Sequence, residues 1–207
     1  MKKRIVKDPD VRRLEIIHAA EELFTKKGYE KTSVEAIIKK AGIAKGTFYY
    51  YFKSKKEILE AIVEQISVSM AAYFTSIVEQ SNLTAIQKFK RMIRGPEKKK
   101  LTSSSAMQII HKPENRELQE KLNIQAIENI APLIAKVLEQ GKDEGVFTAA
   151  PSVELVQLIL AGSQFVLDSG LFTWTAKKRI VYLKELQNLF EALVGIKSGT
   201  LGFISKE

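Results

Sequence analysis

The chain has 207 residues, a formal net charge of +9, two histidines and no cysteine. The lack of cysteine excludes disulfide bonds and thiolate metal sites, and it is consistent with a reducing compartment. The basic start at residues 1–4 is followed by only Ile5 and Val6 before charge returns, so we expect no secretory signal and a cytoplasmic protein.

A first helix is predicted between Asp8 and Gly28. Asp8 suits the N-cap, Pro9 suits the first turn, and Gly28 suits the C-terminal end. One apolar stripe runs between them, formed by Ile16, Ile17, Ala20, Leu23 and Phe24.

Two further helices are predicted in close succession. Residues 32–35 fit a capping box in which Thr32 is the N-cap, and Gly42 follows the helix as its C-cap. Only residues 42–44 separate this helix from the segment 45–52, a spacing typical of a helix-turn-helix. A second capping box at residues 54–57 begins the next helix.

Residues 45–55 place five consecutive positions with aromatic rings, 48–52, between lysines. Phe48 and Phe52 lie one turn apart and can be buried together, while the tips of Tyr49 and Tyr50 project elsewhere. An aromatic patch of this kind is also found in ordinary protein cores. The lysines on either side favour a helix that lies against a polyphosphate.

Most of the positive charge lies in the same part of the chain. Residues 1–56 hold 15 of the 33 Lys and Arg residues but only seven of the 24 Asp and Glu residues, a net of +8. A run of charge is often only a solvated face. Its concentration on the predicted helix-turn-helix favours a surface that binds nucleic acid.

Residues 12–59 follow the pattern of one known protein family. The matching positions are Arg12-Arg13, Phe24, Gly28-Tyr29, Thr32, Ile37-Ile38, Ala41-Gly42 and the run from Lys45 to Lys55. With these residues the segment resembles the DNA-binding domain of TetR-family transcriptional regulators. Two positions depart from the family pattern: Ala44 stands where Ser is common, and Tyr51 where His is common. The alanine removes a helix cap and a possible phosphate contact.

The resemblance implies which residues bind a double-stranded DNA operator. The second helix of a helix-turn-helix meets base edges with its N-terminal part, where Lys45, Gly46 and Thr47 lie. Glycine there either allows close approach to DNA or is simply tolerated in the first turn. Phe48, Tyr51 and Phe52 are expected in the core. The residues that resemble the family's phosphate contacts are Thr32, Ser33, Tyr49, Tyr50 and Lys55.

The rest of the chain is also predicted to be helical. Apolar residues at helical spacing continue to about residue 80, and further helices are expected at about 82–94, after Pro113, at 152–168 and at 176–194. Pro132 is expected to bend the third of these or to begin a new helix. Residues 98–105 are interpreted as a basic loop, and the residues from 196 as a loose tail.

The fold class expected is therefore all-α, with about nine helices. Residues 1–53 form a three-helix DNA-binding domain, and residues 54–207 form a larger helical domain for effector binding and dimerisation. No cofactor or metal site is expected.

The last two helices carry more apolar surface than one neighbour needs. In the family that the chain resembles, two such helices from each subunit form a four-helix interface, so we expect a homodimer; burial within a monomer is the alternative. The residues expected in the interface are Leu155, Leu158, Ile159, Gly162, Phe165, Val166, Leu183, Leu186, Leu189, Phe190 and Leu193.

TetR-like regulators generally hold a small molecule in the larger domain, and the resemblance implies a pocket here. The candidate lining is mostly apolar, as ligand pockets are, which points to a hydrophobic or aromatic effector. Each residue is also a candidate for ordinary core packing. The candidates are Tyr73, Phe74, Phe89, Met92, Met107, Ile110, His111, Gln164, Phe165, Asp168, Phe172 and Trp174.

The predicted function is a sequence-specific transcriptional regulator, and repression is the usual mode of the family. Catalysis is not expected, because His18 and His111 are far apart and no phosphate-loop, zinc-protease or nucleophile-elbow motif occurs in the sequence. A basic amphipathic protein that binds anionic membranes is the alternative. The tight turn between capped helices disfavours it, because an interfacial helix needs no such turn.

Overall fold

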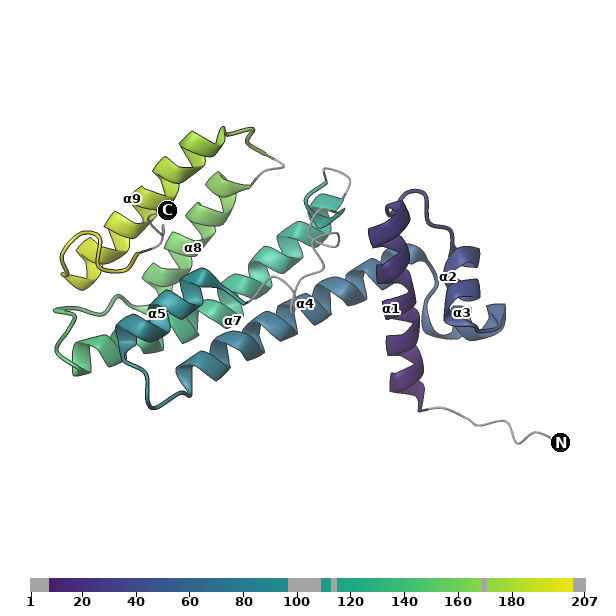
Figure 1. Ribbon diagram of the computed structural model, residues 1–207, viewed down its shortest axis with the longest axis horizontal. Helices are drawn as coiled ribbons and strands as arrows, with labels where there is room; N and C mark the ends of the chain where they lie inside the picture. Colours follow the sequence, from purple (N-terminus) through teal and green to yellow (C-terminus); the bar gives the residue numbers. More distant parts are fainter. Residues whose placement is uncertain (1–7, 97–108, 113–114, 169–170, 203–207) are drawn as a thin grey trace. The chain divides into compact units, whose positions relative to one another are not determined.

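The computed structural model describes residues 8–96, 109–112, 115–168 and 171–202. This part of the chain contains no strand, in agreement with the all-α expectation (Figure 1). Its helices are α1 (Pro9–Lys27), α2 (Val34–Ala41), α3 (Lys45–Tyr51), α4 (Lys55–Val78), α5 (Ala85–Arg94), α7 (Arg116–Asp143), α8 (Val153–Leu167) and α9 (Ala176–Val194).

The chain divides into two compact units. The N-terminal unit ends at Ile66 and also includes Ile109 and Ile110, while the C-terminal unit begins at Ser67. The division lies inside α4, later than the expected boundary at residue 53. The reason is that Ile58 and Leu59 of α4, both fully buried, complete the core of the N-terminal unit.

The core of the N-terminal unit is built from the predicted apolar stripes. Ile16 and Ile17 of α1 are fully buried, together with Ile37 of α2 and Phe48 of α3. Burial of each such side chain contributes about 1.5–3 kcal/mol relative to exposure. This packing gives the short helices α2 and α3 a stability that helices of their length lack alone.

The helix-turn-helix is confirmed, with one correction at the start of α2. Gly42 adopts a left-handed conformation, with φ of 64°, and its N–H donates to the last carbonyl groups of α2. The N-cap of α2 is Ser33 and not Thr32, because Ser33 Oγ accepts a hydrogen bond from the Ala36 N–H. Ala44 caps α3 without any side-chain hydrogen bond, as its substitution for Ser predicts.

The core of the C-terminal unit joins α5, α7, α8 and α9 to the second half of α4. α7 runs without interruption through Pro132. Near its end, Gly141 is required because a Cβ atom there would overlap the ring of Phe147. The most buried members of this core are Ile77, Ala85, Phe89, Ala131, Val137, Leu138, Val156, Phe190, Val194 and Leu201.

A buried lysine ties three helices of this unit together. Lys88 of α5 donates to the Val78 carbonyl at the end of α4, at 2.7 Å, and to Gln140 Oε1 of α7, at 2.8 Å. Gln140 in turn donates to Leu83 O, and Glu144 accepts from the Ala85 N–H. Buried polar groups are thus paired with one another, which fixes the arrangement of these helices.

The residues after α9 are not a loose tail up to residue 202. Glu191 is almost fully buried, and its carboxylate accepts hydrogen bonds from the Gly199 N–H at 2.8 Å and the Leu201 N–H at 2.7 Å. The side chain of Leu201 is fully buried in the core. The buried carboxylate therefore holds the chain back against the helices.

Among the described helices, only α4 has the length and apolar character that would allow it to cross a bilayer. Core helices of soluble proteins often meet the same criterion. The first half of α4 lies in the N-terminal core.

Candidate DNA-binding surface and ligand pocket

The aromatic run on α3 divides into a buried and an exposed set. Phe48 and Phe52 are buried, and the guanidinium carbon of Arg13 lies 5.1 Å from the centre of the Phe52 ring. Tyr50 is 79% exposed and Tyr49 45% exposed. Because α3 turns about 100° per residue, one face anchors the helix and the other offers phenol hydroxyls to solvent.

The start of α3 is open to solvent. Lys45 and Gly46 are exposed and Thr47 is half-buried. Lys45 Nζ lies 6.0 Å from the centre of the Tyr49 ring, so the two side chains lie on the same side of the helix. This surface presents the Lys45 ammonium group, the Thr47 hydroxyl and the phenols of Tyr49 and Tyr50.

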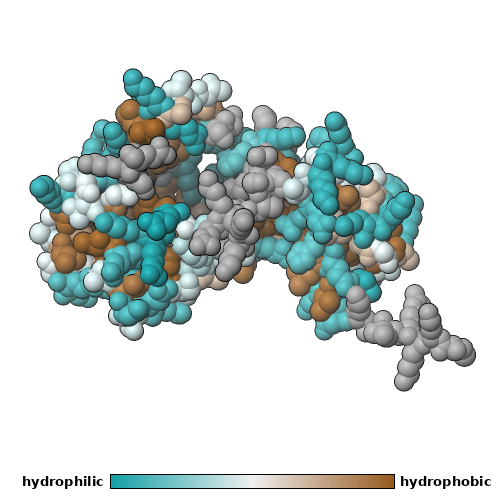
Figure 2. Space-filling view, viewed as in Figure 1, coloured by the Kyte–Doolittle hydropathy of each residue, from teal (hydrophilic) through white to brown (hydrophobic). Residues whose placement is uncertain are grey.

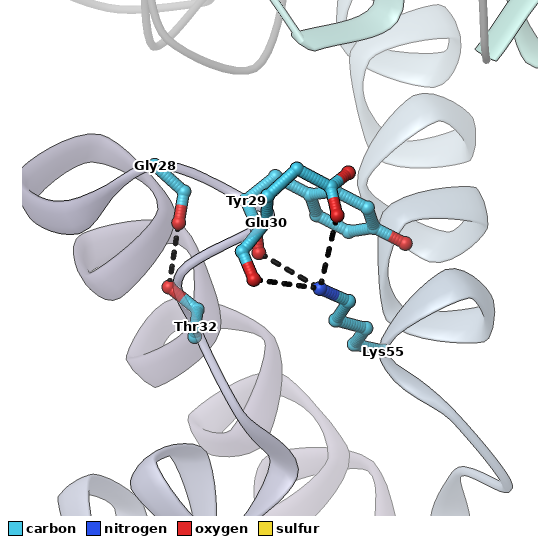
Figure 3. A network of polar contacts seen from close by, with 5 residues as sticks. All are labelled: Gly28, Tyr29, Glu30, Thr32 and Lys55. Carbon is cyan, nitrogen blue, oxygen red and sulfur yellow. Dashed lines mark hydrogen bonds and ion pairs between the residues drawn. The ribbon is translucent and has the colours of Figure 1, made fainter.

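Two residues expected to contact phosphates form hydrogen bonds within the protein. Thr32 is only 1% exposed, and its hydroxyl donates to the Gly28 carbonyl at 2.8 Å (Figure 3). The side chain closes the turn between α1 and α2, which leaves no surface for a phosphate. Ser33, in contrast, is exposed, although its hydroxyl oxygen already accepts the Ala36 N–H.

Lys55 is the second case. Its Nζ donates to the carbonyl oxygens of Tyr29, at 3.0 Å, and Glu30, at 3.3 Å, and lies 3.8 Å from the Glu30 carboxylate (Figure 3). The ammonium also lies 4.3 Å from the centre of the Tyr29 ring. Lys55 therefore attaches the start of α4 to the turn between α1 and α2, a role that the resemblance did not suggest.

The electrostatics of the N-terminal unit follow from these packing contacts. Burial, with a smaller effect from Glu30 and Glu60, raises the pKa of Tyr29, so its hydroxyl stays neutral. Glu22 of α1 forms an ion pair of 2.8 Å with Lys40 of α2, and this hydrogen bond lowers the pKa of the Glu22 carboxyl.

The expected dimer residues separate into exposed and buried groups. Leu158 is 71% exposed, Phe165 56% and Leu189 45%, and Gly162 is also exposed. Ile159 and Phe190 are instead buried in the core of the unit, although Ile159 also lines the groove described below. The others are half-buried: Leu155, Val166, Leu183, Leu186 and Leu193.

A groove of about 430 Å³ lies between α8 and α9. Leu158, Gly162 and Leu189 line it, and a Cβ atom on Gly162 would meet nothing within 4 Å. Ile180 and Val181 of α9 are also more than 40% exposed, and the sequence did not single them out. Hydrophobic residues reach the surface in several patches over the C-terminal unit, as Figure 2 shows for one face.

The candidate effector residues do not form one site. Phe74, Phe89 and Met92 are buried in the core, where they pack against other apolar side chains. Tyr73 is half-buried and donates to Arg91 O, and Ile110 belongs to the N-terminal unit. Met107 lies outside the described residues.

A second group of the candidates lines a pocket of about 290 Å³ between α7 and α8. Gln164, Phe165 and Asp168 contribute to it, as expected. The sequence did not indicate the other lining residues, which come from α7, about 40 positions earlier, from α8 itself (Ala161) and from the loop after α8 (Leu171). The missed residues are Arg116, Gln119, Glu120, Asn123, Ile127, Ala161 and Leu171.

His111 and Trp174 lie outside this pocket. His111 is half-buried, and its Nδ1 has no hydrogen-bond partner within the described ranges. Trp174 donates to the Val166 carbonyl and stacks on Phe172, with ring centres 5.1 Å apart, and Phe172 contacts Phe165. These aromatic residues form a layer beside the pocket.

Comparison with known proteins gives two family matches on this chain. Residues 16–62 match the model of the bacterial regulatory proteins of the tetR family, and residues 99–187 match that of the tetracyclin repressor-like C-terminal domain. The first match covers the helix-turn-helix and the start of α4. The second covers α7, α8 and part of α9.

Individual relatives agree with these matches. The fatty acid metabolism regulator protein of Bacillus subtilis (strain 168) is 27% identical over 187 residues, which cover 87% of this chain and 93% of that protein. The uncharacterized HTH-type transcriptional regulator YvdT of the same organism is 49% identical, but only over 51 residues, 25% of this chain and 26% of that protein.

A solved structure shows the same fold. The fatty acid degradation regulator FadR from Bacillus halodurans superimposes with a TM-score of 0.57 at 23% identity, covering 91% of this chain and 96% of that one. Because both family models match in order along one helical chain, this protein belongs to the TetR family of DNA-binding transcriptional regulators.

Proposed function

We propose that this regulator binds a near-palindromic operator as a homodimer, represses transcription there, and is released by a small, mostly apolar effector. The observation that carries the proposal is the exposed face of α3. Lys45, Thr47, Tyr49 and Tyr50 lie on it, and buried Phe48 holds the helix in place.

The roles on this face follow from position along α3. Lys45, Gly46 and Thr47 at its start are placed to meet base edges in the major groove, since the leading part of a recognition helix enters the groove. Tyr49 and Tyr50 offer hydroxyls to the phosphate backbone, and Ser33 at the start of α2 lies exposed nearby in the sequence. In this proposal Thr32 and Lys55 hold the turn between α1 and α2 in place and do not contact the DNA.

The homodimer is supported by the apolar face on α8 and α9. Leu158, Phe165 and Leu189 are all about half or more exposed, a set that a monomeric protein rarely leaves in contact with water. A second copy packed on the same face would cover them with two-fold symmetry. Two recognition helices would then read half-sites about 34–36 Å apart, which one copy cannot do.

An effector is supported by the match to the ligand-binding part of the family and by the pocket between α7 and α8. The name of the B. subtilis relative ties that protein to fatty acid metabolism, which agrees with an apolar ligand class for this group. A bacterial operator lies in the cytoplasm, and we place this regulator there.

The test is selection of bound duplexes from a random pool with the purified protein. We expect one near-palindromic sequence to be enriched, Lys45→Ala to lower affinity, and Thr47→Ala to relax preference at particular base pairs, typically by about 1–3 kcal/mol per contact. If both variants select the same sequence with unchanged affinity, α3 is not the recognition helix.

The same preparation tests the membrane alternative. Vesicles of phosphatidylglycerol and phosphatidylcholine are added in place of DNA. Binding to these vesicles without binding to any selected duplex would replace the proposal with a membrane function.

A further inference from the structure

We infer that Arg13 of α1 binds a phosphate of the DNA backbone and is held in position for this by the Phe52 ring at the end of α3. None of the DNA contacts proposed above involves this side chain. The inference rests on the proposed function in one respect, because it requires that α3 is the helix that enters the major groove.

The position of the Arg13 guanidinium is fixed relative to α3. Phe52 is the residue at which α3 ends, and its N–H donates to the Phe48 carbonyl at 2.9 Å. Phe52 is only 2% exposed, and its ring lies 6.4 Å from that of the fully buried Phe48. Arg13 lies over the Phe52 ring, with the guanidinium carbon 5.1 Å from the ring centre. An arginine of α1 is therefore held at the C-terminal end of α3.

The hydrogen-bond donors of Arg13 remain available. The guanidinium carries five N–H donors in its plane, and attraction to the face of an aromatic ring uses none of them. Arg13 is exposed and forms no hydrogen bond or ion pair with any residue that the structure describes. Its neighbour differs, because Arg12 Nη1 donates to Glu15 Oε2 at 2.7 Å. Of these two adjacent arginines, only Arg13 has a guanidinium that is not already bound to a carboxylate.

A guanidinium of this kind suits a phosphate. Its planar fork of donors matches the geometry of the phosphate oxygens and can bind two of them at once. Contact with the Phe52 ring also restricts the conformations of the Arg13 side chain before any DNA is bound. Less conformational entropy is then lost when the phosphate contact forms.

The length of α3 places its end near the DNA backbone. Its seven residues, at about 1.5 Å each, give a helix of about 10 Å, whereas the major groove is about 12 Å wide and has phosphates along both edges. A helix that lies across such a groove has both of its ends close to a backbone. Lys45 lies at the start of α3 and Arg13 at its end, so cations flank the helix on both sides.

The alternative role for Arg13 is to shield Phe52 from water. An arginine side chain that covers an aromatic ring can stabilise the fold by packing alone, without any phosphate. Two substitutions separate these roles. Methionine is long enough to cover the ring but has neither the charge nor the donors, and lysine keeps the charge but lacks the planar fork.

The experiment measures the affinity of the full chain for the selected operator and for an unrelated duplex at several salt concentrations. For Arg13→Met we expect both affinities to fall at least about fivefold at low salt, and the slope of log affinity against log salt to decrease by about 0.9 per subunit bound. Arg13→Gln, a second neutral variant, should show the same slope. Arg13→Lys should keep the wild-type slope and recover part of the affinity.

The matched control is Arg12→Met, which removes the same formal charge one residue away. Because Arg12 is bound to Glu15, we expect the slope to change by less than about 0.3 per subunit. The melting temperature of every variant is measured in parallel, so that a loss of folding is recognised as such.

A second measurement locates the contact on the DNA. Duplexes in which one phosphate at a time is replaced by an uncharged methylphosphonate are compared for the wild type and for Arg13→Met. We expect one position in each half-site at which the replacement weakens binding of the wild type but not of the variant. Such non-additivity is the mark of two groups in direct contact.

The outcomes distinguish this contact from the function of the regulator. An unchanged slope for Arg13→Met, or the same response of both proteins at every methylphosphonate, would overturn the inference. A weakening confined to the selected operator would also overturn it, since a phosphate contact carries no sequence information. The proposed function fails in another way: the wild type would select no duplex, or Lys45→Ala and Thr47→Ala would leave the selection unchanged.

Discussion

The ammonium group of Lys55, at the start of α4, lies 3.0 Å from the carbonyl oxygen of Tyr29 in the turn between α1 and α2. The hydrogen bond joins two residues 26 positions apart and connects the first turn of α4 to the turn that precedes α2. α4 runs from the N-terminal unit into the C-terminal unit, and Lys55 lies in its first turn.

Lys55→Met should therefore act through the fold and not through a phosphate contact. Loss of a charged donor to two carbonyl oxygens is expected to destabilise the protein by about 1–3 kcal/mol in urea unfolding. Operator affinity should fall, but the slope of its logarithm against the logarithm of salt concentration should stay the same. A lost phosphate contact would reduce that slope by about 0.9. The neighbouring exposed lysine provides the control, since Lys56→Met should change stability by less than about 0.5 kcal/mol.

Gly46→Ala distinguishes the effect of this residue on the stability of α3 from its effect on how closely the α3 backbone approaches the DNA. A Cβ atom at Gly46 would meet nothing within 4 Å, so alanine is accommodated and should stabilise α3 by about 0.5–1 kcal/mol. We expect the melting temperature to rise while operator affinity, measured by anisotropy, falls several-fold. Unchanged or higher affinity would mean that glycine is only tolerated at this position.

The exposed phenols of α3 should contribute affinity without base preference. Tyr50→Phe removes one hydroxyl from a side chain that is 79% exposed, so the fold should be unaffected. Binding to the selected operator and to unrelated duplex should weaken by similar factors, because phosphate contacts carry no sequence information. A loss confined to the operator would instead place Tyr50 at a base edge.

Gly162→Leu tests the two-fold interface. Within one subunit the position is open, so the new side chain should not disturb the fold but should block close approach of a second copy. Light scattering at micromolar concentration should show a monomer, with operator affinity reduced at least tenfold. Gly162→Ala is the control, expected to remain dimeric. A dimeric Gly162→Leu protein would place the interface elsewhere.

Glu191 should be required for the ordered segment after α9. Its carboxylate accepts the N–H groups of Gly199 and Leu201, and Glu191→Ala leaves both donors without this partner. We expect a loss of about 2–4 kcal/mol in stability, given about 1–3 kcal/mol for each buried group. Hydrogen exchange of these two amides should become fast. Glu191→Gln, which retains one acceptor oxygen, should have a smaller effect.

The pH dependence of stability should differ in sign for two neighbouring carboxyls of α1. Burial raises the pKa of Glu21, and the nearby His18 lowers it by less. Its contribution to stability is therefore present at low pH and lost as pH rises through the folded-state pKa. The melting temperature of the Glu21→Gln variant should exceed that of the wild type by a growing amount as pH rises from about 4 to 7.

Glu22 provides the opposite case, because its hydrogen bond to Lys40 lowers the pKa of the carboxyl. Its contribution is present at neutral pH and is lost as pH falls through the folded-state pKa. The melting temperature of the Glu22→Gln variant should lie below that of the wild type at pH 7, and the two melting temperatures should become equal at acidic pH. If the melting-temperature difference from the wild type had the same sign for both variants at pH 7, the assigned contacts would be contradicted.

Much of the local structure could be predicted from residues close together in the sequence. Asp8, Ser152 and Thr175 cap α1, α8 and α9 as their types suggest, and Gly42 gives the turn its left-handed conformation. These features depend on side chains within four positions of the backbone groups that they satisfy. The choice between Thr32 and Ser33 as the cap of α2 could not be made this way, because both are common N-cap residues and the choice depends on how tertiary packing buries Thr32.

The sequence by itself determined the helices, the two-part organisation and the surface of α3, because helical periodicity and capping are local properties. Only the tertiary structure decided what Lys55 and Glu191 contact and which residues line the α7–α8 pocket. Lys55 meets Tyr29 across 26 positions, and Gln119 meets Asp168 across 49. Such contacts depend on how whole helices pack. For that reason the sequence alone did not show that Lys55 binds the turn between α1 and α2, or that polar residues of α7 and α8 line one pocket.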